Sequence, residues 1–370
     1  MEKVIALLAA LLVLLGTGLC ARAEPAAEFS GGRAQIEAAL PDEARGALGE
    51  MDIDPENGGV LSLSFSDALK ALLNMAREQA YAPLKLFAAL MGVVLLCALS
   101  QSMSDGGTGS LKSVFSAVGV LAGAGITLTA ISGVLRDTLA LLSDAAAFML
   151  SFIPVFTAVV AVMGHVTSAA AMNASTLAAT QLFSQLAVNF LAPLCGAVIG
   201  LSAAGSVYPD LNLSKLGEMV KKFVTWGLSL LMTVFTALLS AQTFVANAAD
   251  SAATRAAKFM VSSGVPIVGG TISDAVNTVQ GGLIMLKSSV GTYGIAAAAV
   301  IILPTLVTAL CYKLAISCAA AAGEMFSLKE LSGLLKSCDA AMSIMLAVMS
   351  CFLLLSIIAV VIMLSMTNAS

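Results

Sequence analysis

The residues with the clearest potential for chemistry lie in one stretch, between positions 250 and 287. Three charged side chains there flank a run of helix-breaking residues; the charged residues are Arg255, Lys258 and Asp274, and the breakers are Gly264, Pro266, Gly269 and Gly270. Because glycine and proline interrupt a helix, several backbone N–H and C=O groups lose their helical partners. Each such group is costly in lipid, so we expect the break to be buried between membrane helices or to line a polar cavity. The flanking charges could close it electrostatically.

This stretch follows a pattern of helix, break and helix. Its first half places Ala257 and Met260 on one helical face and Lys258 on the other, and its second half separates Val276 from Asn277 in the same way. The stretch is too polar to cross a bilayer as a plain helix and too regular for a hydrated loop. A second interpretation stays open, in which two helices lie in the headgroup plane and the charges anchor them there.

The rest of the chain offers little for catalysis. His165 is the one histidine, so any His-based metal site or catalytic dyad has a single candidate, which is more simply an imidazole at a loop or helix end. The sequence contains no P-loop motif, no Ser-x-x-Lys pair and no Gly-x-Ser-x-Gly elbow. We predict that the protein is not an enzyme, with no catalytic residue, no metal and no cofactor.

Two further charges stand inside apolar segments. Lys313 and Asp144 are surrounded by hydrophobic residues, and an ionisable residue within a membrane helix is often functional. The alternative is that the helix ends nearby and the side chain reaches the membrane interface. The sequence leaves both interpretations open.

Composition identifies the class of protein. Of the 370 residues, 59% are hydrophobic and 11% are charged, against about 25% charged in an average soluble domain. Several apolar runs reach the roughly 20 residues that cross a bilayer. We therefore predict an all-α polytopic membrane protein, a bundle of about six or seven transmembrane helices with amphipathic surface or re-entrant helices. The net charge of −4 provides no basic field for nucleic acid, so the expected surroundings are the lipid bilayer.

The N-terminal region precedes the membrane domain. Residues 1–23 resemble a secretory signal peptide, with Lys3, a short apolar core and a small-residue site at Ala21-Arg22-Ala23; an uncleaved anchor is the alternative. Residues 24–82 form an acidic extracytoplasmic segment, weakly helical around 36–40 and 42–48. It ends in an amphipathic juxtamembrane helix at 66–80.

The helical membrane domain covers residues 83–370. Apolar spans are expected at 84–103, 114–135, 177–204, 226–247, 295–317 and 340–366, joined by links that include 165–176 and 324–339. Residues 138–163 contain Asp144 and Pro154, so they could be a surface helix with a half-span instead of a crossing. Treating them as a non-crossing hairpin places five lysines on the cytoplasmic side, which favours six crossings. Two glycine pairs, Gly119/Gly123 and Gly196/Gly200, predict close helix packing.

The run TRAAKFMVSSGVPIVGGTISDAVNTV at 254–279 closely resembles the central segment of the stage III sporulation protein AE family. FIPVFTAVVAVMG at 152–164 and LSFSDALKALL at 63–73 also fit that family, whereas the acidic residues 24–59 match it poorly. The resemblance implies a mother-cell membrane protein of endospore-forming bacteria, located in the outer forespore membrane. It implies partners among the other membrane proteins of the same operon and one partner from the forespore side, in a trans-envelope channel or secretion-like complex.

A stand-alone small-solute permease is the competing function. Pro154, Pro193 and Pro304 interrupt spans, and the central stretch could form paired half-helices, as in transporters. Transporters usually carry convincing charges within the membrane, and this chain has few. The two functions differ in whether the protein works inside a complex or alone.

Overall fold

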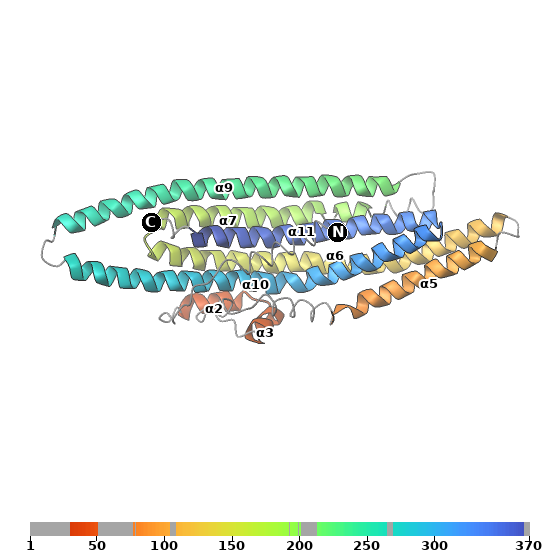
Figure 1. Ribbon diagram of the computed structural model, residues 1–370, viewed down its shortest axis with the longest axis horizontal. Coiled ribbons are helices and arrows are strands. Elements are labelled where there is room, and N and C mark those ends of the chain that lie inside the picture. The colour runs from red at the N-terminus through yellow and green to blue at the C-terminus, as the bar shows by residue number, and fades with distance from the viewer. Residues whose placement is uncertain are drawn as a thin grey trace.

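The computed structural model describes most of the chain as a long bundle of α-helices (Figure 1). The described residues are 30–50, 77, 79–103, 109–191, 193–198, 200, 213–264 and 269–365. The predicted signal peptide at 1–23, most of the predicted amphipathic helix at 66–80, and Pro266 lie outside them. The described part of the chain contains helices and no strand, which confirms the all-α class.

Two short helices come first, α2 (Ser30–Ala38) and α3 (Asp42–Glu50). The long helices that follow are α5 (Tyr81–Met103), α6 (Gly109–Val162), α7 (Val166–Leu186), α9 (Leu213–Gly264), α10 (Gly269–Met325) and α11 (Lys329–Ser365). A π-helical turn, η3 (Ala187–Leu191), continues α7. In Figure 1 the long helices run side by side along the long axis, with α9 on one edge and α2 and α3 beside α10 on the other.

Six described stretches are long and apolar enough to cross a membrane. They are Tyr81–Gln101, Ala117–Val162, Val166–Val198, Gly217–Ala252, Gly281–Met325 and Lys329–Ser365. The polytopic helical class is therefore confirmed, and six lies within the predicted range of six or seven membrane helices.

Helix α6 corrects the expected layout. The prediction of a span at 114–135 followed by a separate half-span or hairpin at 138–163 is wrong, because both segments belong to one helix of 54 residues. The helix passes through Arg136 and Asp137 and contains Pro154. Charged residues are compatible with helical geometry, and a proline removes only one backbone hydrogen bond. Tertiary packing holds this region in place, since Ile153 and Phe156 beside the proline are fully buried.

The two predicted links are also largely helical. Residues 165–176 form most of the first half of α7, and residues 324–339 contain the end of α10, a short turn and the first turns of α11. The small polar residues of α7 are weak helix formers, but Ser168, Met172 and Thr176 are buried against the bundle. Packing of one helical face therefore outweighs local propensity here.

Helix α11 lies at the centre of the bundle. It contacts α6, α7, α9 and α10, and its side chains are buried around most of its circumference. Phe352 of α11 packs against Phe183 of α7 with ring centroids 5.3 Å apart. A helix that is apolar on all sides is typical of the centre of a bundle.

A row of stacked rings on α6 fixes its contact with α10. Phe148, Phe152 and Phe156 stack in sequence with centroids 5.6 Å apart, and all three are fully buried. Gly294 of α10 lies directly against this row, where a Cβ atom would overlap the Phe152 ring. The close approach of the two helices therefore depends on the missing side chain at Gly294.

One of the two predicted glycine pairs brings helices together. A Cβ atom at Gly119 would overlap the thiol of Cys97 on α5, and one at Gly123 would lie 2.7 Å from a leucine side chain of α11. A Cβ atom at Gly196 or Gly200 would meet no atom within 4 Å. The close packing predicted for the first pair is confirmed, whereas the structure shows none at the second.

Candidate functional site

Two long helices lie on either side of the predicted break. Helix α9 is described as far as Gly264 and α10 from Gly269, and residues 265–268 between them lie outside the described part of the chain, so the break stays a prediction. The two helices are continuous with their neighbouring membrane stretches and have 52 and 57 residues, which differs from a pair of short half-helices. Their ends meet at one tip of the molecule and extend beyond α7 and α11 (Figure 1).

The predicted site residues are distributed along this tip. Arg255 and Lys258 lie on α9, Arg255 is exposed, and Gly264 is the last residue of that helix. Gly269 and Gly270 open α10, and Asp274 follows in its second turn. Pro266 lies between the two helices, outside the described residues. The proposed electrostatic closure of the break by Arg255, Lys258 and Asp274 stays a prediction.

At the base of the tip, the structure brings Asp250 of α9 to the start of α7. The Asp250 carboxylate is almost fully buried and accepts hydrogen bonds from the backbone N–H groups of Thr167 at 3.1 Å and Ser168 at 2.9 Å. The Ser168 hydroxyl adds a hydrogen bond of 3.2 Å to Asn247 Oδ1. Thr167 and Ser168 are the second and third residues of α7, whose first N–H groups have no partners within the helix.

Asp250 therefore supplies the cap that α7 lacks locally. His165 occupies the N-cap position but makes no capping hydrogen bond with its side chain. An N-cap side chain normally accepts from the second or third N–H of the helix, and Asp250 accepts from both across the bundle. Its negative charge also faces the positive end of the helix dipole. His165 Nδ1 lies 3.9 Å from the same carboxylate, so the imidazole stands at a helix end as expected.

Lys287 of α10 binds the C-terminal end of a helix, whereas Asp250 binds an N-terminal end. Its side chain is 1% exposed, and Nζ donates a hydrogen bond of 3.0 Å to the backbone carbonyl of Leu364. Leu364 belongs to the last turn of α11, where carbonyl groups lack helical partners and the dipole favours a cation. An acid on α9 and a base on α10 thus each hold the end of a neighbouring helix.

Asp250 and Lys287 mark the base of the tip. We call residues 251–264 and 269–286 the α9–α10 arm. Both ends of the arm are held to the bundle by charge-assisted hydrogen bonds to helix termini, which are stronger than neutral ones. Sequence inspection alone includes these two residues in the stretch but misses their function. The sequence feature that could have indicated this function is that each residue is charged and lies at the edge of an apolar segment.

A second ionic contact lies between α10 and α11. Lys313 Nζ is 2.6 Å from Asp339 Oδ1, with side chains 13% and 21% exposed. Lys313 thus pairs with Asp339 inside the bundle, and the helix does not end at Lys313 but continues to Met325. The two residues lie at similar distances on either side of the turn between α10 and α11, so an antiparallel hairpin brings them together. Asp144, by contrast, is exposed on the surface of α6.

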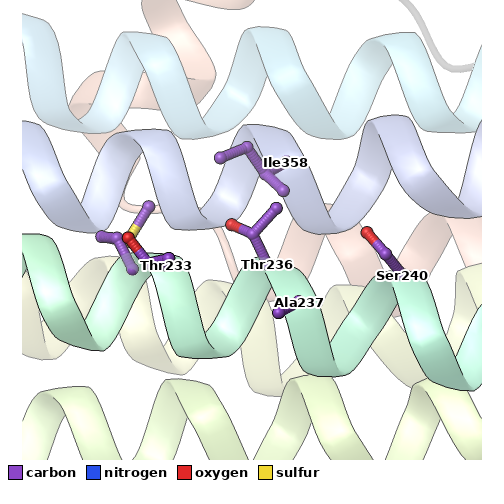
Figure 2. A pocket seen from close by; sticks show the side chains of 6 residues that line it. Thr233, Thr236, Ala237, Ser240 and Ile358 are labelled. Atoms are coloured by element: carbon purple, nitrogen blue, oxygen red, sulfur yellow. The ribbon is translucent and has the colours of Figure 1, made fainter.

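A shallow groove lies between α9 and α11 (Figure 2). Its volume is about 470 Å³, and it is lined by Met232, Thr233, Thr236, Ala237 and Ser240 of α9 and Ile358 of α11. Thr233 uses its hydroxyl within α9, where it donates to the carbonyl of Ser229 at 2.8 Å. Small hydroxyl residues of this kind line helix contacts in membranes, but the groove contains no charged side chain.

Comparison with known proteins decides the family. The family model described as stage III sporulation protein AE matches residues 53–367, which include all six apolar stretches and the α9–α10 arm. The chain belongs to the stage III sporulation protein AE family. The resemblance of residues 254–279 to that family is thereby confirmed, and the acidic residues 24–52 lie outside the matched range.

A curated member of the family is similar over most of this chain. Stage III sporulation protein AE of Bacillus subtilis (strain 168) is 25% identical over 263 residues, which cover 70% of this chain. The matched part spans 63% of the length of that relative. No solved structure matches the chain.

Proposed function

We propose that this protein is a non-enzymatic membrane subunit of a stage III sporulation complex that connects mother cell and forespore. The observation that carries the proposal is the family match over residues 53–367, which includes every described membrane-capable stretch. In this role the chain works in the outer forespore membrane, together with other membrane proteins of its operon and a partner from the forespore side. Late forespore development would depend on it.

One feature of the structure supports a scaffold role. The charged contacts at Asp250, Lys287 and Lys313 all join helices to one another or to helix ends. Each of these charges is committed to the architecture of the bundle, as expected for a subunit whose task is to hold a defined shape.

Deletion and recovery experiments test the proposed function. Deleting the gene should arrest spore development after engulfment, and an affinity-tagged copy from sporulating cells should co-purify with the other membrane products of its operon. Normal spores from the deletion strain would overturn the sporulation role. Recovery of the tagged protein only as a free monomer or homodimer would instead favour the stand-alone permease.

A further inference from the structure

Charged residues of the long helices gather at one height along the bundle. They are Lys85 of α5, Arg136 and Asp137 of α6, Glu218 and Lys222 of α9, Lys313 of α10 and Asp339 of α11, and we call them the charged layer. Lys313 and Asp339 form the ion pair of 2.6 Å, and the other five residues are exposed. The charged layer thus combines residues from five helices that lie far apart in the chain.

Contact between α5 and α6 fixes the height of Lys85. The two helices are antiparallel (Figure 1), and a Cβ atom at Gly119 of α6 would overlap the Cys97 thiol of α5. Continued along both helices, this register places Lys85 beside residue 131 of α6, less than two turns before Arg136.

The same height follows for α11 and α9. Leu331 of α11 lies against Gly123 of α6, and these two helices run in the same direction (Figure 1). About two turns further along both helices, Asp339 therefore lies beside the turn of α6 that Lys85 meets. On α9, a Cβ atom at Gly217 would lie 3.8 Å from Ala340, the residue after Asp339. The charges that follow Gly217 on α9 therefore belong to the same layer.

Exposed aromatic rings flank the charged layer. Trp226, the one tryptophan of the chain, lies one turn after Lys222 on α9 and is 63% exposed. Tyr81 lies one turn before Lys85 on α5 and is 78% exposed. Exposed tryptophan and tyrosine beside lysine and arginine are typical of a membrane–water interface, where the rings lie among the headgroups and the cations reach the phosphates.

Apolar surface continues on both sides of the charged layer. On one side, residues 86–103 of α5 and 113–135 of α6 contain no charged residue, and we call them the α5 zone. On the other side, residues 223–249 of α9 contain none, and we call them the α9 zone. Leucines are exposed in both, with Leu96 of the α5 zone at 68% and Leu238 of the α9 zone at 53%.

The two zones together are too long for one bilayer. Helix α6 passes beside both, and its membrane-capable stretch Ala117–Val162 has 46 residues. At 1.5 Å per residue this is about 70 Å, against about 30 Å for the hydrocarbon core. The bundle would have to tilt by more than about 60° to place all of it in hydrocarbon, whereas membrane helices tilt by about 0–40°. The charged layer would then also lie in hydrocarbon, which is costly.

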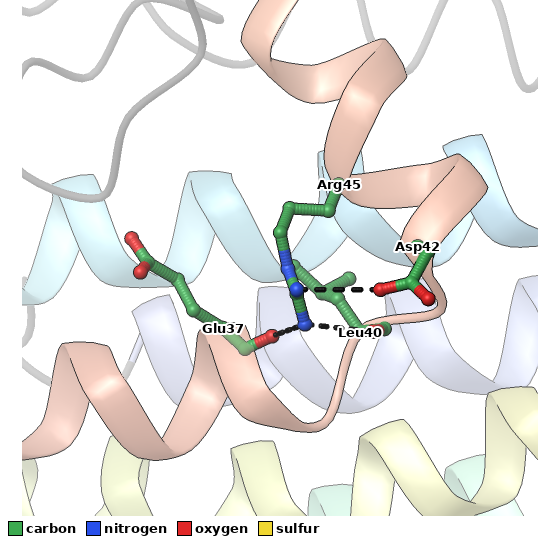
Figure 3. Close-up of polar contacts among 4 residues, drawn as sticks. All are labelled: Glu37, Leu40, Asp42 and Arg45. Carbon is green, nitrogen blue, oxygen red and sulfur yellow. Dashed lines mark hydrogen bonds and ion pairs between the residues drawn. The ribbon is translucent and has the colours of Figure 1, made fainter.

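The charges of α2 and α3 form a separate group beside α6 and α10. The Arg45 guanidinium donates to the backbone carbonyls of Glu37 at 2.7 Å and Leu40 at 3.3 Å (Figure 3). It also lies 3.3 Å from Oδ1 of Asp42, the first residue of α3. Arg45 therefore holds the junction between these two short helices, whereas the charged layer is made by the long helices.

We propose that the charged layer lies at the surface of a bilayer, where its cations and the flanking rings contact lipid phosphates and headgroups. The α5 zone and the α9 zone are then in different surroundings, because one lies in the hydrocarbon and the other stands outside it. A headgroup-binding surface is thereby assigned to the middle of the bundle. The sporulation role is not needed for this assignment, which depends on the register of the long helices.

Quenching of tryptophan fluorescence by brominated lipid tests the assignment. The full-length protein is reconstituted in phosphatidylcholine vesicles whose acyl chains carry bromine close to the headgroup or deep in the hydrocarbon. The native Trp226 reports on the charged layer from α9. In a Trp226→Phe background, Tyr81→Trp reports on the layer from α5, and Leu96→Trp and Leu238→Trp report on the two zones. All four positions are exposed, so the substitutions leave the packing of the bundle intact.

We expect Trp226 and Tyr81→Trp to lose about twice as much fluorescence with shallow bromine as with deep bromine. Of the two zone reporters, one should lose about half of its fluorescence with deep bromine and the other less than about a tenth, since the hydrocarbon is only about 30 Å thick. Similar deep quenching of Leu96→Trp and Leu238→Trp, or quenching of neither, would overturn the separation of the zones. Stronger quenching of Trp226 or Tyr81→Trp by deep bromine would place the layer in hydrocarbon and overturn the headgroup contact.

Discussion

The carboxylate of Asp250 accepts the backbone N–H of Ser168 at 2.9 Å, although the two residues are 82 positions apart in the chain. This contact makes the start of one membrane-capable helix depend on a residue near the end of another membrane-capable stretch. It also ties the short turn between α6 and α7 to the base of the α9–α10 arm. The beginning of α7 is therefore set by tertiary packing, since its own N-cap residue, His165, provides no side-chain cap.

Replacing Asp250 should loosen the start of α7. We expect Asp250→Ala to destabilise this helix end by about 0.5–2 kcal/mol, the usual cost of a lost N-cap, and Asp250→Asn to have a smaller effect because one acceptor oxygen remains. Hydrogen exchange of the Thr167 and Ser168 amides, measured in nanodiscs, reports the change directly. Asp144→Asn, which alters an exposed carboxylate on α6, is the matched control and should leave these amides protected. Unchanged protection in Asp250→Ala would contradict the capping role.

The Lys313–Asp339 pair should behave as a partly buried ion pair. Removing one partner leaves a charge with little access to water, so Lys313→Met or Asp339→Asn should lower the free energy of unfolding by up to about 3–5 kcal/mol, the range for fully buried pairs. Thermal unfolding in detergent measures the loss. The double exchange Lys313→Asp with Asp339→Lys should restore part of it.

The exposed contact between Lys336 and Glu324 provides the control for that pair. Both side chains are about half exposed, so Glu324→Gln should change stability by at most about 1 kcal/mol. The prediction is contradicted if Glu324→Gln lowers the free energy of unfolding as much as Asp339→Asn does. It is also contradicted if the double exchange Lys313→Asp with Asp339→Lys restores no stability.

Gly294 should tolerate no side chain. A methyl group there would overlap the Phe152 ring, which is itself fixed between Phe148 and Phe156, so Gly294→Ala should destabilise by about 1–3 kcal/mol. Gly281→Ala on the same helix is the control, because a Cβ atom there meets nothing within 4 Å. That change should be neutral or gain up to about 1 kcal/mol from better helix propensity. Thermal unfolding of the two variants side by side distinguishes them, and equal stability would refute the contact.

The break in the α9–α10 arm should be needed for function. Replacing Gly269 and Gly270 with leucine should abolish spore formation and leave membrane insertion intact if the start of α10 packs against other helices. If the arm lay on the membrane surface, added apolar bulk would be tolerated or would strengthen membrane binding. Spore counts together with the amount of protein in the membrane fraction separate these cases. A fully functional double-leucine variant would remove the arm from the centre of the mechanism.

The class of fold could be predicted from short-range patterns, whereas the family was predicted from the resemblance of residues 254–279 to its central segment. Apolar runs of membrane-spanning length, the glycine pair at Gly119 and Gly123, and the breakers between Gly264 and Gly269 each act through residues that are near neighbours in the chain. The hydrophobic effect and backbone sterics work on such local patterns, so a sequence reveals them directly.

Tertiary structure alone decided which charges meet and where the helices end. Asp250 reaches Thr167 across 83 positions, Lys287 reaches the carbonyl of Leu364 across 77, and Lys313 reaches Asp339 across 26. The uninterrupted course of α6 through Arg136 and Pro154 has the same origin, because neighbouring helices pack along it. These outcomes depend on which helices lie side by side, and a local pattern of charge or hydropathy does not contain that information.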